Sequence, residues 1–123
     1  VVEKKLNCIH MEGREVFKLA VQKMIHAAHQ ALQMAHRKDT ELTLLIPHQA
    51  NLRIIDATAR RMGIGNEKVM VNIQKYGNTT AGTIPLCLSD WETRLKKGDN
   101  IILAAFGGGF TWGAVYLRWA YTA

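Results

Sequence analysis

Cysteine and proline are scarce in this chain of 123 residues, which has two of each. Cys8 and Cys87 lie far apart and match no spacing that is typical of a metal site or a redox motif. We therefore expect reduced thiols, a cytoplasmic setting and no bound metal. No proline-rich or serine-rich linker and no internal repeat divides the sequence, so residues 1–123 are interpreted as one domain.

Long hydrophobic runs are absent as well. The longest uncharged stretch, residues 101–117, is interrupted by four glycines and by polar side chains, which excludes a membrane helix there. Residues 1–5 carry charges where a secretory signal needs an apolar run. Because the sequence begins with valine and not with methionine, we expect it to be a piece of a longer protein.

The residues that are present are typical of a folded protein. Hydrophobic residues make up 48% of the chain and charged residues 21%, which excludes a disordered protein. The formal net charge of +6 favours an acidic partner, such as nucleic acid, an anionic membrane, a phosphate-bearing cofactor or an acidic carrier protein. The charge alone does not choose among these partners.

Hydrophobic periodicity alternates along the chain between that of strands and that of helices. It predicts strands at residues 5–11, 42–46, 69–73, 100–106 and 111–120. It predicts helices from Gly13 to about residue 36, from residue 49 to 62 and, with an irregular start at Pro85, up to about Leu95. This order predicts an α/β fold with a mostly parallel sheet, and the short final loop makes the last strand antiparallel.

Three of the predicted strand ends carry residues that are suited to chemistry. His48 follows the strand at 42–46, and an imidazole can act as an acid, a base or a donor to an oxyanion. Asn78 carries an amide that donates without a change of charge. The glycines at 107–109 allow backbone N–H groups to approach a ligand closely. The structural alternatives are a capping or packing histidine, an N-cap turn and a plain hairpin.

Basic side chains form a further pattern on the helix predicted at residues 49–62. Arg53, Arg60 and Arg61 fall broadly opposite its apolar stripe. A solvated helix face is one interpretation, and a docking face for an anionic partner is the other. The position of this face just beyond His48 favours docking.

Together, these segments resemble the C-terminal half of β-ketoacyl-acyl carrier protein synthase III, a condensing enzyme of the thiolase superfamily. The matching segments follow the family's order at nearly the family's spacing and are His10–Lys18, Ile46–Ile55 (which begins IPHQAN), Tyr76–Pro85 and Phe106–Ala114 (FGGGFTWGA). The resemblance implies a thiolase-like half, with a five-stranded mixed sheet of order 3-2-1-4-5, an antiparallel last strand and helices packed on it. It also implies an acyltransferase that initiates fatty-acid synthesis by decarboxylative Claisen condensation of acyl-CoA with malonyl-acyl carrier protein.

The resemblance assigns roles to individual residues. It assigns catalytic roles to His48, Asn78 and Gly108. It places His48 and Asn78 at the enolate formed from the malonyl thioester, and the backbone N–H of Gly108 at a second oxyanion hole. The positions along the tunnel for the pantetheine arm of coenzyme A are Gly13, Phe17, Ala50 and Asn51. The positions of the basic face that meets the acyl carrier protein are Arg53, Arg60 and Arg61.

The nucleophilic cysteine of the family lies in the N-terminal half, and neither Cys8 nor Cys87 matches it. We expect the fragment alone to be inactive and to expose apolar surface that the missing N-terminal half covers. For the full-length enzyme the resemblance implies a cytoplasmic homodimer that uses coenzyme A thioesters as substrates and holds no resident cofactor. The alternatives are a condensing enzyme of secondary metabolism, a non-catalytic module for coenzyme A or carrier protein, and a nucleic-acid-binding domain. The last is disfavoured because aromatic and basic residues are not interleaved.

Overall fold

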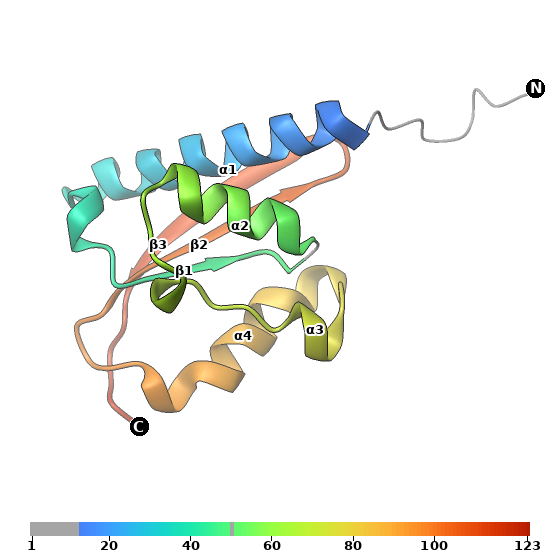
Figure 1. The fold of residues 1–123 in the computed structure, drawn as a ribbon. Coiled ribbons are helices and arrows are strands. Elements are labelled where there is room, and N and C mark those ends of the chain that lie inside the picture. The colour runs from blue at the N-terminus through green and yellow to red at the C-terminus, as the bar shows by residue number, and fades with distance from the viewer. Residues whose placement is uncertain (1–12, 50) are drawn as a thin grey trace, which may run out of the picture.

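A computed structural model describes residues 13–49 and 51–123, and a mixed sheet lies at the centre of this part of the chain (Figure 1). The strands that these residues form are β1 (Leu44–Pro47), β2 (Asn100–Gly107) and β3 (Thr111–Arg118), in the order β1-β2-β3. β1 pairs with β2 in parallel, and β3 pairs with β2 in antiparallel orientation. The α/β class and the antiparallel last strand are therefore confirmed.

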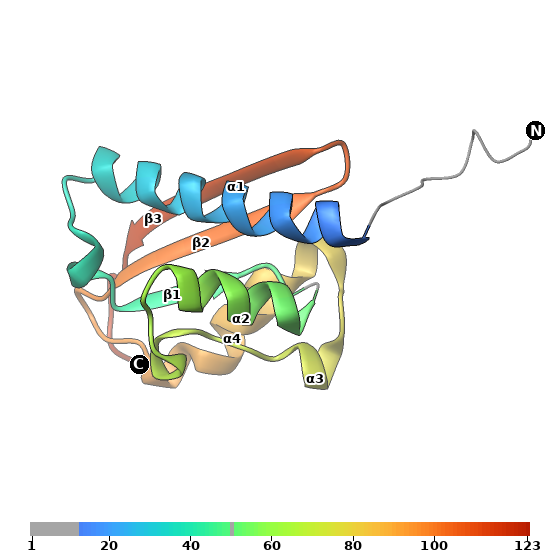
Figure 2. The same cartoon turned by 45° about the horizontal axis from the view of Figure 1, so that its top comes forward.

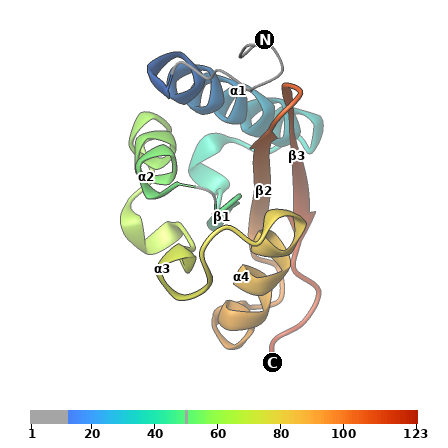
Figure 3. The same ribbon diagram turned by 90° about the vertical axis from the view of Figure 1, so that its right-hand side faces the viewer.

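Helices cover both faces of the sheet. They are α1 (Gly13–Met34), α2 (Leu52–Arg61), α3 (Ile73–Tyr76) and α4 (Thr83–Trp91). Short 3-10 turns lie at Asp39–Glu41, Asn66–Lys68, Thr80–Gly82 and Glu92–Arg94. α1 and α2 lie on one face and α4 on the other (Figures 1 and 3). Figure 2 shows α1 running along β2 and β3.

Side-chain alternation along the strands divides the core into two clusters. Leu45 and Ile102 pack in the cluster that includes Ile55 of α2. Their chain neighbours Leu44 and Ile101 pack on the opposite face with residues of α4. All four residues of β1 are buried, which agrees with the interpretation of its nearly all-apolar run as a strand covered on both faces.

The strand predicted at 69–73 is wrong over most of its length. Val69 forms a single parallel bridge with Leu45, and Ile73 already begins α3. The pairing stops there because β1 ends at Pro47. Beyond Pro47, the segment is held by hydrogen bonds to a side chain and not by strand pairing. The Gln49 side chain bonds to Met70 O and accepts from the backbone N–H of Asn72.

The expected sheet order also needs a correction. Order 3-2-1-4-5 places the first predicted strand between the second and the fourth, but β1 pairs directly with β2 from Leu44↔Ile101 to Pro47↔Ala104. These main-chain partners leave no room for a strand between them. The first predicted strand, at residues 5–11, lies outside the described residues, and a five-stranded sheet is not confirmed.

The third predicted helix is broken into parts, as Pro85 suggested. The 3-10 turn at Thr80–Gly82 precedes α4, so that Pro85 falls in the first turn of α4, where its missing N–H costs no helical hydrogen bond. The second helix begins at Leu52 and not at residue 49 because Asn51 caps it. Across residues 13–49 and 51–123, no helix combines the length and the apolar character needed to cross a membrane.

Candidate functional site

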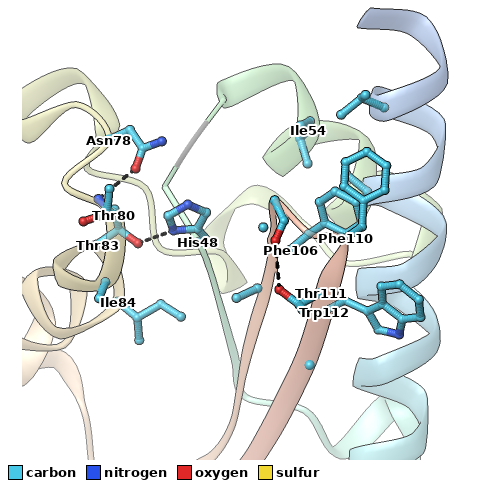
Figure 4. Close-up of a pocket in the computed structure, with 17 residues that line it drawn as sticks. His48, Ile54, Asn78, Thr80, Thr83, Ile84, Phe106, Phe110, Thr111 and Trp112 are labelled. Carbon is cyan, nitrogen blue, oxygen red and sulfur yellow. Dashed lines mark hydrogen bonds between the residues drawn. The ribbon is translucent and has the colours of Figure 1, made fainter. Parts of the chain in front are cut away.

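The carboxyl ends of β1 and β2 open into a cavity of about 870 Å³. Because these two strands are parallel, the residues that follow them meet at one edge of the sheet. The cavity is lined by His48 after β1, by Gly108 after β2 and by Asn78 in the loop after α3 (Figure 4). The structure thus brings together the three residues predicted as catalytic, while their roles stay predictions.

His48 is held by both its backbone and its ring. Its backbone N–H donates to Ala104 O at 2.8 Å, which extends the β1–β2 pairing one residue beyond β1. Its Nδ1 lies 2.6 Å from the hydroxyl oxygen of Thr83, at the start of α4 (Figure 4). Partial burial lowers the pKa of the His48 imidazole below its ordinary value, so the neutral form of the ring predominates at pH 7. A neutral imidazole can donate one hydrogen bond into the cavity.

Asn78 is placed by a sharp turn. Gly77 ends α3 with a φ of +67°, a conformation that favours glycine. The side-chain oxygen of Asn78 then accepts a hydrogen bond from the backbone N–H of Thr80 at 2.9 Å. This bond fixes the orientation of the amide, and the side-chain nitrogen of Asn78, which has no partner among the hydrogen bonds of the described residues, is its donor end.

The glycine turn joins β2 to β3 at the rim of the cavity. Gly109 has a φ of +132°, which other residues rarely adopt, and the backbone of Gly108 has open space where a Cβ would lie. Aromatic rings flank the turn, with Phe106 stacked on Phe110 at 5.3 Å and beside Trp112 at 6.4 Å between ring centroids. The cavity thus has one apolar wall opposite His48 (Figure 4).

The predicted tunnel residues divide between two settings. Phe17 of α1 lies beneath the guanidinium of Arg53, whose Cζ is 5.6 Å from the ring centroid. The cavity itself is lined from α1 by Val16 and Ala20, which were not predicted as site residues. Gly13 is exposed at the first position of α1, and residue 50 lies outside the described residues.

Asn51 has a clear structural role, because its side chain caps α2. Its oxygen accepts hydrogen bonds from the backbone N–H groups of Arg53 at 2.8 Å and Ile54 at 3.4 Å. We expect Asn51→Ala to lower the free energy of unfolding by about 1 kcal/mol and Asn51→Asp to preserve it, because aspartate also caps helices. Urea unfolding of the three proteins tests this, and equal stability of Asn51→Ala and wild type would contradict the capping role.

The three arginines of the predicted basic face lie on the surface of α2, and their role in docking stays a prediction. Arg53, Arg60 and Arg61 are exposed, whereas Ile55 and Ala59 of the same helix are buried. Arg53 precedes Ile54, which lines the cavity, so the basic face begins at the cavity rim.

Two residues that support the site were not predicted. Gln49 is completely buried, and its side-chain amide nitrogen donates to Pro47 O at 2.8 Å and Met70 O at 3.1 Å. Thr83, which is 2% exposed, contacts the ring of His48. No spacing in the sequence distinguishes these two residues from ordinary loop and helix positions.

Cys87 does not contribute a nucleophile to the cavity. It is buried, its thiol donates to the side-chain oxygen of Asn72 at 3.3 Å, and burial raises the thiol pKa to about 11. The thiol is therefore protonated at neutral pH, as expected of an inert core cysteine. Within the described ranges, no three His, Cys, Asp or Glu side chains are grouped so that they could hold a metal ion.

Comparisons with known proteins identify the family of this chain. The family described as 3-oxoacyl-[acyl-carrier-protein (ACP)] synthase III C terminal matches residues 32–119. A β-ketoacyl-[acyl-carrier-protein] synthase III of Porphyromonas gingivalis is 52% identical over 120 residues, which are 98% of this chain and 36% of that protein. The chain thus spans about a third of the length of such relatives.

Solved structures show the same relationship. The crystal structure of 3-oxoacyl-[acyl-carrier-protein] synthase III from Aquifex aeolicus has a TM-score of 0.86 and 52% identity, covering 93% of this chain and 38% of that one. A priming β-ketosynthase of a polyketide biosynthetic pathway has a TM-score of 0.81 and 30% identity, covering 93% and 35% of the two chains.

Proposed function

The chain belongs to the family of C-terminal domains of 3-oxoacyl-[acyl-carrier-protein] synthase III, and we propose that it is the C-terminal catalytic part of such an enzyme. The proposed reaction is the decarboxylative condensation of an acyl-CoA with malonyl-acyl carrier protein, the first step of fatty-acid elongation. The observation that carries the proposal is that His48, Asn78 and Gly108 line a single cavity.

The first proposed step is loss of carbon dioxide from the malonyl thioester. The bond to the carboxylate breaks, and its electron pair forms an enolate with negative charge on the thioester oxygen. Donors aimed at this oxygen stabilise the charge, and no added carboxylate is needed. The neutral imidazole of His48 and the amide nitrogen of Asn78 supply such donors, and the bond from Thr80 N–H to the oxygen of Asn78 orients that amide.

The second proposed step joins two carbons. The enolate carbon attacks an acyl group held as a thioester on a cysteine of the remaining part of the protein. The resulting tetrahedral oxyanion collapses and releases the cysteine thiolate. The backbone N–H of Gly108 would stabilise this second oxyanion at the glycine turn.

Binding of the long substrates is proposed for the α1–α2 side of the cavity. The pantetheine arm would pass along Gly13, Phe17, Ala50 and Asn51. The exposed guanidinium groups of Arg53, Arg60 and Arg61 would meet the acidic acyl carrier protein, and this attraction should weaken with salt. We propose coenzyme A thioesters as substrates, no resident cofactor and a cytoplasmic homodimer for the complete enzyme.

The remaining part of the enzyme is proposed to cover the aromatic rim of the cavity. Phe110 and Trp112 are each 44% exposed at this rim. Large apolar side chains grouped at an open cavity are typical of a surface that another domain covers. Without that domain, the site lacks its nucleophile and one wall.

A chimera tests the proposed function. In it, this chain replaces the matching C-terminal segment of the Porphyromonas gingivalis relative, which supplies the rest of the protein. We expect the isolated chain to form no β-ketoacyl product from acyl-CoA and malonyl-acyl carrier protein, and the chimera to form it. A chimera that folds and binds both substrates but condenses nothing would favour a non-catalytic binding module and contradict the proposal.

A further inference from the structure

The positions of the heavy atoms do not show which group donates the hydrogen bond between His48 and Thr83. Nδ1 and the hydroxyl oxygen are 2.6 Å apart, and each can donate or accept. If Thr83 donates, the single proton of the neutral ring is on Nε2. If Nδ1 donates, Nε2 is an acceptor and cannot stabilise an oxyanion.

The other hydrogen bonds of the turn decide the direction. A threonine in a helix commonly donates its hydroxyl proton to the carbonyl oxygen four residues earlier, which here is Thr79 O. That oxygen already accepts from the hydroxyl of Thr80 at 2.7 Å and from the backbone N–H of Gly82 at 3.1 Å. Both lone pairs of Thr79 O are therefore occupied. The carbonyl three residues earlier, Thr80 O, accepts from the backbone N–H of Thr83 and is not a partner of its hydroxyl.

The Thr83 hydroxyl has one partner among the hydrogen bonds of residues 13–49 and 51–123, namely His48 Nδ1. Thr83 is 2% exposed, so a hydroxyl proton turned away from His48 would be left without an acceptor in a buried position. Donation from Thr83 to Nδ1 avoids this loss.

We infer that Thr83 is a positioning residue, whose hydroxyl donates to Nδ1 of His48 and holds the ring proton on Nε2. The same turn acts on Asn78, whose side-chain oxygen accepts from the backbone N–H of Thr80. The segment Thr80–Thr83 thus donates one hydrogen bond to each side chain and leaves their N–H groups for the cavity. The catalytic consequence rests on the proposed function, whereas the tautomer itself does not.

Nitrogen NMR of the whole chain with labelled histidine tests the tautomer, and His48→Ala assigns the His48 signals. At a mildly alkaline pH, we expect Nε2 to carry the proton and Nδ1 to be unprotonated in wild type and in Thr83→Ser. In Thr83→Val, and in Thr83→Ala if the valine variant does not fold, we expect a mixture of both tautomers. A proton on Nδ1 in wild type, or a hydroxyl-free variant with the wild-type spectrum, would overturn the inference.

The chimera provides a second readout. We expect Thr83→Val to lower kcat by about 10- to 100-fold with little change in KM, and Thr83→Ser to restore most of it. A loss of kcat without a change of tautomer would contradict the positioning role and leave the proposed function intact. An inactive chimera together with the expected tautomer change would contradict the proposed function and leave the inference intact.

Discussion

Replacing His48 by alanine in the chimera is expected to lower the rate of malonyl decarboxylation by about 100- to 1,000-fold, the effect of removing one preorganised oxyanion donor. The ring lies in the cavity wall, its neutral form predominates at pH 7, and its Nδ1 is occupied by Thr83. Its loss removes this N–H donor from the cavity and also leaves the buried Thr83 hydroxyl without its acceptor, so the stability of the variant is measured beside its activity. Release of labelled carbon dioxide from malonyl-acyl carrier protein measures the effect.

The control for this substitution is His26→Ala, which changes an exposed histidine of α1. We expect this control to retain wild-type activity. If His48→Ala decarboxylates as fast as His26→Ala, His48 does not stabilise the enolate. A circular dichroism spectrum of each variant separates a catalytic loss from unfolding.

Asn78 extends this prediction, because its two amide ends have different partners. Asn78→Asp keeps an oxygen that accepts from Thr80 N–H, but it places a carboxylate where the enolate charge develops. We expect a larger loss of decarboxylation from Asn78→Asp than from Asn78→Ala. Asn66→Asp adds the same charge at an exposed position and is expected to be neutral. An Asn78→Asp enzyme as active as Asn78→Ala would contradict the donor role.

Much of the site is predictable from sequence because it depends on local signals and one general rule. Apolar runs and helical periodicity mark β1, β2, α1 and α2, and residues that follow parallel strands meet at one sheet edge. His48 and Gly108 follow such strands directly. Their convergence could therefore be predicted without knowledge of any side-chain contact.

The features that the sequence did not predict depend on side-chain contacts and on helix packing. Residues 69–73 have the composition of a strand, but a buried glutamine amide takes the place of their next strand partners. Similarly, Phe17 and Val16 are neighbours on α1, and only the packing angle of the helix decides which one lines the cavity. Thr83 reaches His48 across 35 positions of sequence, a distance over which periodicity carries no information.

Replacement of Gln49 is expected to destabilise the chain strongly. Its side chain is fully buried and makes three hydrogen bonds. The amide nitrogen donates to Pro47 O at 2.8 Å and to Met70 O at 3.1 Å, and the amide oxygen accepts from the backbone N–H of Asn72 at 2.9 Å. Gln49→Leu keeps a similar volume but leaves all three backbone groups without this partner. Since an unsatisfied buried group costs about 1–3 kcal/mol, we expect the free energy of unfolding to fall by about 3 kcal/mol or more.

Gln22→Leu is the matched control, because Gln22 is exposed on α1 and leucine has a similar helix propensity. Urea unfolding should show a large shift of the midpoint for Gln49→Leu and almost none for Gln22→Leu. Gln49→Glu is expected to be destabilising as well, because a carboxylate cannot donate to Pro47 O or Met70 O. Equal midpoints for the two leucine variants would mean that the segment after Val69 is held by apolar packing. In that case the loop that carries His48 would not depend on the buried amide.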